Sequence, residues 1–335
     1  MTVVNGIEID QIYYKPNEIK MAIENNVPIE EKLHVILVVS NPCLYARRYI
    51  LMKEFLLRFE NEESNAIVYI VELAYGKQKH YMTESNNPRH LQLRTDTPLW
   101  HKENMINLGV KYLLPHTWKA FAWIDADLEF LSSTWATDAL RVLNGSKDIV
   151  QLFSHCIDMD AKKETMKIVN SAGFQYCEGK KYYTTGMDYW HPGYAWAMTR
   201  KAYEKIGGLY EMGILGSGDF IMQTGILGKG LDCLNKSNSD DYKDSVGQFQ
   251  TKIRNLRFGY VPGVLKHYFH GSKKNRKYTE RWKILIEHGY SPYQHLVKDS
   301  VGLLVPGSAF PEGLKADILK YFKERNEDEG YQLYA

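Results

Sequence analysis

The sequence contains few cysteines, and those it has are isolated. Cys43, Cys156, Cys177 and Cys233 are spread over 335 residues without a Cys-x-x-Cys pair. This spacing argues against a zinc knuckle and gives no sign of a disulfide framework. We expect four reduced thiols, most of them buried.

Long apolar runs are also missing. No stretch approaches the roughly 18 to 20 residues that a membrane-spanning helix needs. The first 30 residues lack the charged-then-apolar pattern of a signal peptide. The sequence therefore predicts a protein that has no membrane span and is located in the cytoplasm.

The sequence carries little net charge, +2, which argues neither for nor against a polyanionic partner. Lys and Arg nevertheless gather between Lys266 and Lys283. Aromatic residues are abundant, with 24 Tyr and 7 Trp, and they can stack on sugar rings or bases as well as fill a core. Apolar residues at 44% and charged residues at 24% are ordinary for a globular protein.

Apolar runs typical of buried strands alternate with amphipathic helices through the first 155 residues. The expected strands span residues 33–39, 66–73, 121–124 and 148–154, and the expected helices span 45–59, 100–114 and 135–143. This alternation predicts an α/β fold with a parallel, doubly wound sheet and helices on both faces. Three polar or irregular stretches, 74–97, 160–193 and 230–250, are expected to be loops or lids.

Two acids, Asp125 and Asp127, directly follow the apolar strand at 121–124. Ligands of open α/β sheets bind at this edge. Two carboxylates at i and i+2 can face one hard cation, Mn²⁺ or Mg²⁺, which neutralises the charge of a diphosphate leaving group. The alternative is a helix N-cap with a spare surface acid.

The segment 123–130 resembles the Asp-x-Asp region of GT-A glycosyltransferases. The resemblance is to family 2-like enzymes and to their relatives among the polypeptide N-acetylgalactosaminyltransferases and β-1,4-galactosyltransferases, and it covers roughly residues 33 to 285. It implies a GT-A type fold, a divalent metal and a nucleotide diphosphate sugar, a UDP-sugar, as the donor. Asp125 would then reach the ribose or diphosphate, and Asp127 the metal.

The same resemblance implies further donor contacts and a division of the chain. An acid at the end of the second strand, here Glu72, contacts the donor base in the family. Lys102 and Asn107 lie in a segment, 101–109, that is similar to the family's basic helix ending in Asn-x-Gly. The implied domains are an N-terminal extension (1–30), a catalytic domain with donor and acceptor halves (31–155 and 156–285) and a C-terminal helical extension (286–335).

A second group of motifs contains an acid that could act as a base. The stretch from His191 through Gly207-Gly208-Leu209 to Asp219 resembles the family's path from a small-residue strand to an acid at a helix start. At a helix N-terminus Asp219 stays ionised and can accept the proton of an acceptor hydroxyl. Such a base implies one in-line displacement with inversion at the anomeric carbon. Alternatively, Asp219 only caps its helix.

Two histidines near a basic stretch, His267 and His270, resemble the His that completes the metal site late in GT-A domains. Alternation along a strand would put them on opposite faces, so one metal ligand is expected. Lys274 and Arg276 follow and suit the donor diphosphate.

Four aromatic residues between the metal and base motifs are the expected acceptor platform: Trp190, His191, Tyr194 and Trp196. Aromatic faces stack on sugars and on unpaired bases alike. The sequence therefore leaves two classes of acceptor, a glycan or a hydroxymethylated pyrimidine in DNA. The basic cluster at 273–281 is compatible with binding to DNA.

Two other classes of protein compete with this interpretation. A nucleotidyltransferase acting on sugar phosphates would carry a Gly-rich phosphate loop after its first strand, where this chain has Ser-Asn-Pro-Cys-Leu-Tyr at 40–45. A non-catalytic carbohydrate- or nucleic-acid-binding module would not need carboxylates, histidines and a base together.

Overall fold

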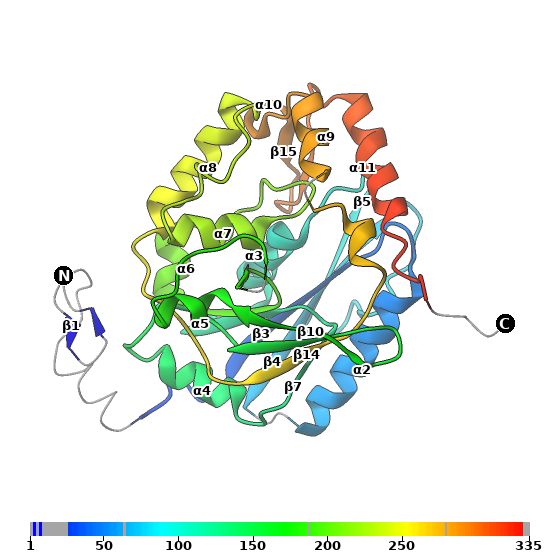
Figure 1. The fold of residues 1–335 in the computed structure, drawn as a ribbon. Coiled ribbons are helices and arrows are strands. Elements are labelled where there is room, and N and C mark those ends of the chain that lie inside the picture. The colour runs from blue at the N-terminus through cyan, green and yellow to red at the C-terminus, as the bar shows by residue number, and fades with distance from the viewer. Residues whose placement is uncertain are drawn as a thin grey trace.

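The structure, a computed structural model, describes residues 3–4, 7–8, 26–62, 65–186, 188–278 and 280–330. Of the predicted N-terminal extension it describes the short strands β1 (Val3–Val4) and β2 (Ile7–Glu8) and residues 26–30. The remainder of that extension lies outside the described residues. Figure 1 shows a central sheet with helices on both sides of it.

The central sheet has the strand order β13-β8-β12-β6-β3-β4-β5. β12 runs antiparallel to both of its neighbours, and the other neighbouring pairs are parallel. The predicted α/β class with a mostly parallel sheet is confirmed. Its strands are β3 (Leu33–Ser40), β4 (Ala66–Tyr75), β5 (His90–Thr95), β6 (Ala120–Ile124), β8 (Ile149–Gln151), β12 (Ala195–Thr199) and β13 (Phe258–Tyr260).

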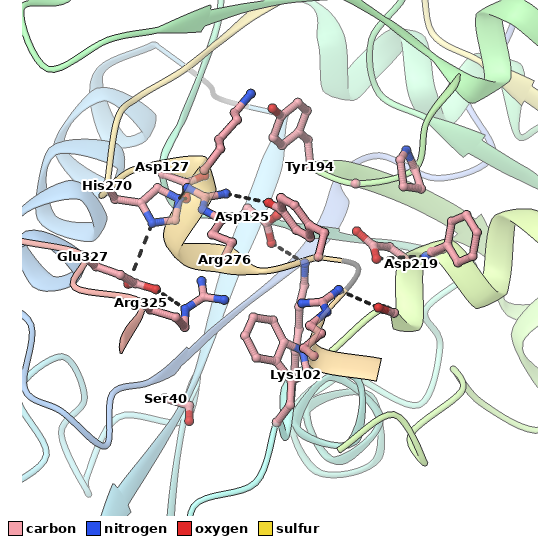
Figure 2. A pocket seen from close by; sticks show the side chains of 18 of the residues that line it. Ser40, Lys102, Asp125, Asp127, Tyr194, Asp219, His270, Arg276, Arg325 and Glu327 are labelled. Atoms are coloured by element: carbon pink, nitrogen blue, oxygen red, sulfur yellow. Dashed lines mark hydrogen bonds and ion pairs between the residues drawn. The ribbon is translucent and has the colours of Figure 1, made fainter. Parts of the chain in front are cut away.

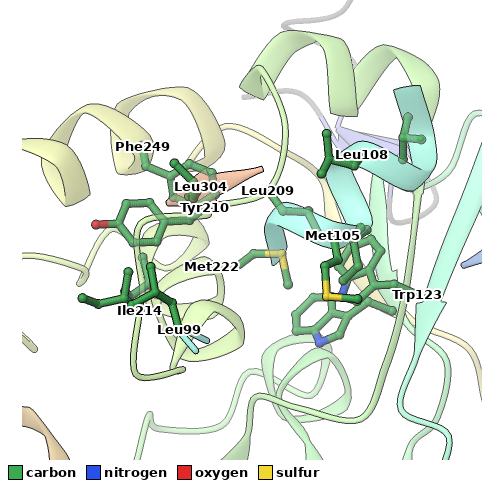
Figure 3. Close-up of a cluster of buried hydrophobic side chains, with 14 of the residues drawn as sticks. Leu99, Met105, Leu108, Trp123, Leu209, Tyr210, Ile214, Met222, Phe249 and Leu304 are labelled. Atoms are coloured by element: carbon green, nitrogen blue, oxygen red, sulfur yellow. The ribbon is translucent and has the colours of Figure 1, made fainter. Parts of the chain in front are cut away.

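Alternate side chains of the central strands pack into two different cores. Val35 and Leu37 of β3 face the layer of α2 (Ala46–Glu62) and α4 (Trp135–Val142). Ile36 faces the opposite layer, which contains α3 (Lys102–Leu113), α6 (Arg200–Ile206) and α7 (Gly218–Ile226). Figure 3 shows part of this second core, where Met105 and Leu108 of α3 lie near Trp123 of β6. Within the described ranges, no helix is long and apolar enough to cross a membrane.

The order of strands creates a switch point at β3. The chain adds β4 and β5 on one side of β3 and then returns to place β6 on the other side. Connections that leave the carboxyl ends of two such strands diverge and leave a crevice where ligands bind. Ser40 ends β3 and Asp125 follows β6, so both lie at this crevice.

A second sheet, in the order β11-β10-β9-β14-β7, brings distant segments beside Asp127. His267, the last residue of β14, is level with Leu128 of β7 on one side and with Asp158 of β9 on the other. Its strands are β7 (Leu128–Phe130), β9 (His155–Met159), β10 (Thr165–Ser171), β11 (Trp190–His191) and β14 (Val264–His267).

The three stretches predicted as loops contain regular structure, so those predictions are partly wrong. β5 lies in the first, and β10 and α5 (Ala172–Cys177) lie in the second. The third contains most of α8 (Asp240–Ile253), which begins after its N-cap, Ser239. The polar residues of α8 are mostly on its exposed face, and Tyr242, Val246 and Phe249 form a buried stripe at helical spacing.

The C-terminal part of the chain folds against the layers around the central sheet. It contains α9 (Arg281–Glu287), α10 (Pro292–His295), the hairpin of β15 (Leu296–Lys298) and β16 (Leu304–Pro306), and α11 (Glu312–Glu324). After α11 the chain reaches the start of α2, where the carboxylate of Asp328 accepts hydrogen bonds from the backbone N–H groups of Ala46 and Arg47, at 3.0 and 2.8 Å. Residues 286–330 are therefore more than a helical extension, because they include a hairpin and cap α2.

Candidate active site

A cavity of about 1030 Å³ opens over the carboxyl ends of β3 and β6. Figure 2 shows Asp127 and His270 on one side of this pocket, Asp219 on the other, and Asp125 and Lys102 between them. The cavity contains nine of the residues that the sequence predicts for the site: Lys102, Asp125, Asp127, His191, Tyr194, Asp219, His267, His270 and Arg276.

Asp127, His267 and His270 form a group that could hold a metal ion. One ligand atom of each residue lies within 4.8 Å of the others. Oδ2 of Asp127 is 2.8 Å from Nε2 of His270 and 3.8 Å from Nε2 of His267. The second carboxylate oxygen, Oδ1, is buried without a hydrogen-bond partner among the described residues. Two imidazoles and an under-used carboxylate fit a divalent cation.

The prediction that the two histidines lie on opposite faces is wrong. β14 ends at His267, so the alternation of a strand does not continue to His270. The chain bends after β14, and the two rings meet at a centroid distance of 5.4 Å. Both histidines therefore face Asp127.

Asp125 does not join this group, in contrast to the prediction that both acids face one cation. Its carboxylate forms an ion pair with the ammonium group of Lys102. Burial alone would lower the pKa of Lys102, but the charges of Asp125 and Asp219 outweigh burial and raise it. Lys102 therefore stays a cation between the two carboxylates.

Each histidine has a second carboxylate behind it. Nδ1 of His267 is 2.8 Å from Oδ1 of Asp158, which also pairs with Lys273. Burial alone would raise the pKa of Asp158, but the hydrogen bond and charge of His267 outweigh it and lower that pKa to about 2. Nδ1 of His270 is 3.8 Å from Oε2 of Glu327. Both ring orientations leave Nε2 facing Asp127.

Four arginines, Arg48, Arg276, Arg281 and Arg325, line the cavity, and the last three meet at one tyrosine. The hydroxyl of Tyr321 on α11 accepts hydrogen bonds from Arg281 at 3.3 Å and from Arg325 at 3.1 Å, and it donates one to the carbonyl of Arg276 at 3.1 Å. Nε of Arg276 and of Arg281 are buried and, within the described chain, without a hydrogen-bond partner. Such donors can bind the oxygens of a diphosphate. Lys274 is exposed and is not part of the cavity wall as described, in contrast to the prediction.

Asp219 lies in the first turn of α7, as the sequence predicts. Its Oδ1 accepts the backbone N–H of Phe220 at 2.9 Å. Its Oδ2 is so close to Gly193 that a Cβ atom there would be 2.8 Å away, so a larger residue at 193 would displace the carboxylate. Glu103 is packed against this turn, and burial raises the pKa of Glu103 to about 7. Oδ2 of Asp219 remains at the cavity wall, across from the metal group.

The aromatic wall of the cavity differs from the predicted acceptor platform. Trp190 and Trp196 are 3% and 1% exposed and belong to the core, so their predicted contact with an acceptor is wrong. His191 and Tyr194 do line the cavity, with rings stacked at 4.0 Å, and Tyr189 joins them. Trp190 and His191 are successive residues of β11 and point to opposite faces, so only one of the two rings can line the cavity. Burial lowers the pKa of His191 to about 3, so this ring is neutral at pH 7.

Glu72 and Asn107 form hydrogen bonds that hold the backbone, in contrast to their predicted roles in donor binding. The carboxylate of Glu72 accepts hydrogen bonds from the backbone of Tyr81 and Met82, at 2.7 and 3.0 Å, and so holds the loop after β4. Asn107 is hydrogen-bonded to both backbone groups of Leu209, at 2.8 and 3.0 Å. Neither residue is part of the cavity wall formed by the described chain.

The likeness of this chain to known proteins is distant. No protein-family model and no curated protein matches it. It is similar to the solved structure of a mutant Drosophila β-1,4-galactosyltransferase 7 in complex with manganese, UDP-Gal and xylobiose, at 11% identity over 82% of this chain and 93% of that chain, with a TM-score of 0.36. The catalytic domain of the same enzyme with xylobiose gives 11% identity, 83% and 93% coverage and a TM-score of 0.34.

Proposed function

We propose that the chain is a metal-dependent glycosyltransferase of the GT-A type, which transfers a sugar from a UDP-sugar to an acceptor hydroxyl with inversion. The observation that carries this proposal is the meeting of three groups in one cavity. The metal group of Asp127, His267 and His270 lies on one side of the cavity and Asp219 on the other, and arginines line the same cavity. A binding module needs no such combination.

Each group has a role in the proposed transfer. A divalent cation held by Asp127 and the two histidines would neutralise negative charge on the leaving diphosphate. Arg281 and Arg325 bind the diphosphate oxygens, and Asp219 accepts the proton of the attacking hydroxyl. Because this base is on the side opposite to the leaving group, the proposed displacement is in line and inverts the anomeric centre.

The ligand set favours Mn²⁺ over Mg²⁺ as the metal of the proposed reaction. Mg²⁺ takes oxygen ligands in a strict octahedron, whereas Mn²⁺ accepts imidazole nitrogens more readily. Asp127 supplies the single carboxylate of the group.

The direct test is release of UDP. The protein is incubated with Mn²⁺ and a panel of nucleotide sugars, with and without acceptors, and free nucleoside diphosphate is measured. We expect UDP release that needs Mn²⁺ and rises with the right acceptor. Release of pyrophosphate from a nucleotide and a sugar phosphate would instead identify a nucleotidyltransferase.

The acceptor is proposed to be a glycan or a hydroxymethylated pyrimidine in DNA, and salt distinguishes them. Binding to DNA would weaken by about a hundredfold or more between 50 and 200 mM salt if several phosphates are contacted, and Lys274→Glu would flatten that dependence. Lys205→Glu, on the exposed face of α6, is the control. A neutral glycan would bind equally well across the series, and that result would exclude DNA.

Asp158→Asn is expected to weaken Mn²⁺ binding by about tenfold, because His267 loses the carboxylate that fixes its ring. Asp160→Asn, two residues further along the chain, is the matched control and should leave Mn²⁺ affinity unchanged. Titration of Mn²⁺ followed by electron paramagnetic resonance (EPR) measures both. Equal affinities for the two variants would contradict a positioning role for Asp158.

A further inference from the structure

Nε2 of His270 has two close neighbours of opposite character. Oδ2 of Asp127 is 2.8 Å from this nitrogen, and Nη2 of Arg276 is also 2.8 Å from it. A carboxylate oxygen can only accept a hydrogen bond, and a guanidinium can only donate one. An imidazole nitrogen offers either a proton or a lone pair. Nε2 can therefore form a hydrogen bond with only one of these two neighbours at a time.

A metal ion would compete with Arg276 for this nitrogen. Imidazole binds metals through the lone pair of an unprotonated nitrogen. Arg276 needs the same lone pair to donate its hydrogen bond to His270. A cation bound between Asp127 and His270 therefore requires the guanidinium to leave Nε2, and the repulsion between two positive charges acts in the same direction.

The other contacts of Arg276 indicate where its guanidinium can go. Nη1 donates a hydrogen bond to the hydroxyl of Tyr278 at 3.1 Å, and Nε is buried without a partner among the described residues. The backbone carbonyl of Arg276 is bound by Tyr321, the residue that also holds Arg281 and Arg325. The backbone of Arg276 is thus held beside Arg281 and Arg325, and its released side chain stays within reach of them.

We infer that Arg276 couples metal binding to diphosphate binding. The guanidinium is hydrogen-bonded to His270 until a metal takes Nε2, and it then binds the donor diphosphate together with Arg281 and Arg325. Each ligand consequently raises the affinity for the other, as reciprocal coupling requires. The part that concerns the diphosphate rests on the proposed function, whereas the competition with metal does not.

The test measures Mn²⁺ affinity of the full-length protein by EPR after removal of metal with a chelator, with and without UDP. Arg276→Gln is expected to bind Mn²⁺ several-fold to about tenfold more tightly than wild type when UDP is absent, because a competing donor is gone. The ratio of Mn²⁺ affinity with UDP to that without UDP should be several-fold smaller in this variant than in wild type. These two effects have opposite signs, which a general loss of structure would not produce.

Lys274→Gln is the matched control, because Lys274 is exposed on the same short helix, η1 (Lys273–Arg276), and should change neither value. Arg276→Lys serves as a second variant, since it retains the charge but loses the planar fork that reaches His270 and Tyr278 together, and it should give an intermediate Mn²⁺ affinity. Unchanged or weaker Mn²⁺ binding in folded Arg276→Gln overturns the inference, whether or not UDP binds. Failure of UDP to bind wild type at saturating Mn²⁺ would instead overturn the proposed function.

Discussion

Asp127→Ala is expected to abolish metal-dependent transfer while the protein stays folded. Asp127 supplies the only carboxylate of the described metal group, so its loss leaves the diphosphate charge uncompensated. Metal stabilisation of such charge amounts to several kcal/mol, and each 1.4 kcal/mol changes a rate about tenfold. We therefore expect turnover to fall by at least about a thousandfold.

The measurement combines three readouts on the same preparation: turnover, Mn²⁺ affinity and thermal unfolding. Asp138→Ala, which removes a surface carboxylate of α4 that pairs with Arg141, is the control and should retain both turnover and metal binding. Undiminished turnover of Asp127→Ala at saturating Mn²⁺ would show that the acid does not hold the metal.

Asp219→Asn is expected to lower kcat by about two to four orders of magnitude and to leave UDP affinity nearly unchanged. An amide keeps the shape and can still accept the backbone N–H of Phe220, but it cannot take up the acceptor's proton. A loss of kcat without a loss of ground-state binding identifies an interaction made only in the transition state.

Steady-state kinetics and UDP binding are measured for this variant beside Asp232→Asn. Asp232 also lines the cavity but lies outside the first turn of α7, so its change should be much smaller. Equal loss of UDP affinity and kcat in Asp219→Asn would recast Asp219 as a donor contact.

Local patterns predicted those parts of the protein that depend on neighbours in the sequence. The apolar run that becomes β3 and the amphipathic repeat that becomes α2 are visible at short range, and so is the position of Asp125 and Asp127 after a strand. Their place at the sheet's switch point follows from the alternation of strands and helices.

Residues that complete the site through tertiary contacts were not predicted. Asp158 reaches His267 only because β9 and β14 are neighbours in a second sheet. Arg325 and Glu327 lie after α11, and no motif marks them. Trp190 and Trp196 were misplaced because a two-residue strand and a central strand turn these rings into the core, where burial of a large apolar surface outweighs exposure to a ligand.

Asp328 caps α2 from near the end of the described chain, so this contact forms late during synthesis. A nascent chain emerges from its N-terminus, and domains tend to fold as their residues appear. The strands from β3 to β14 are complete long before the ribosome adds Tyr321, Arg325 and Glu327. A chain still being translated therefore holds Asp127 and both histidines but lacks the residues that orient the arginines. The proposed donor site is complete only when almost the whole described chain has been made.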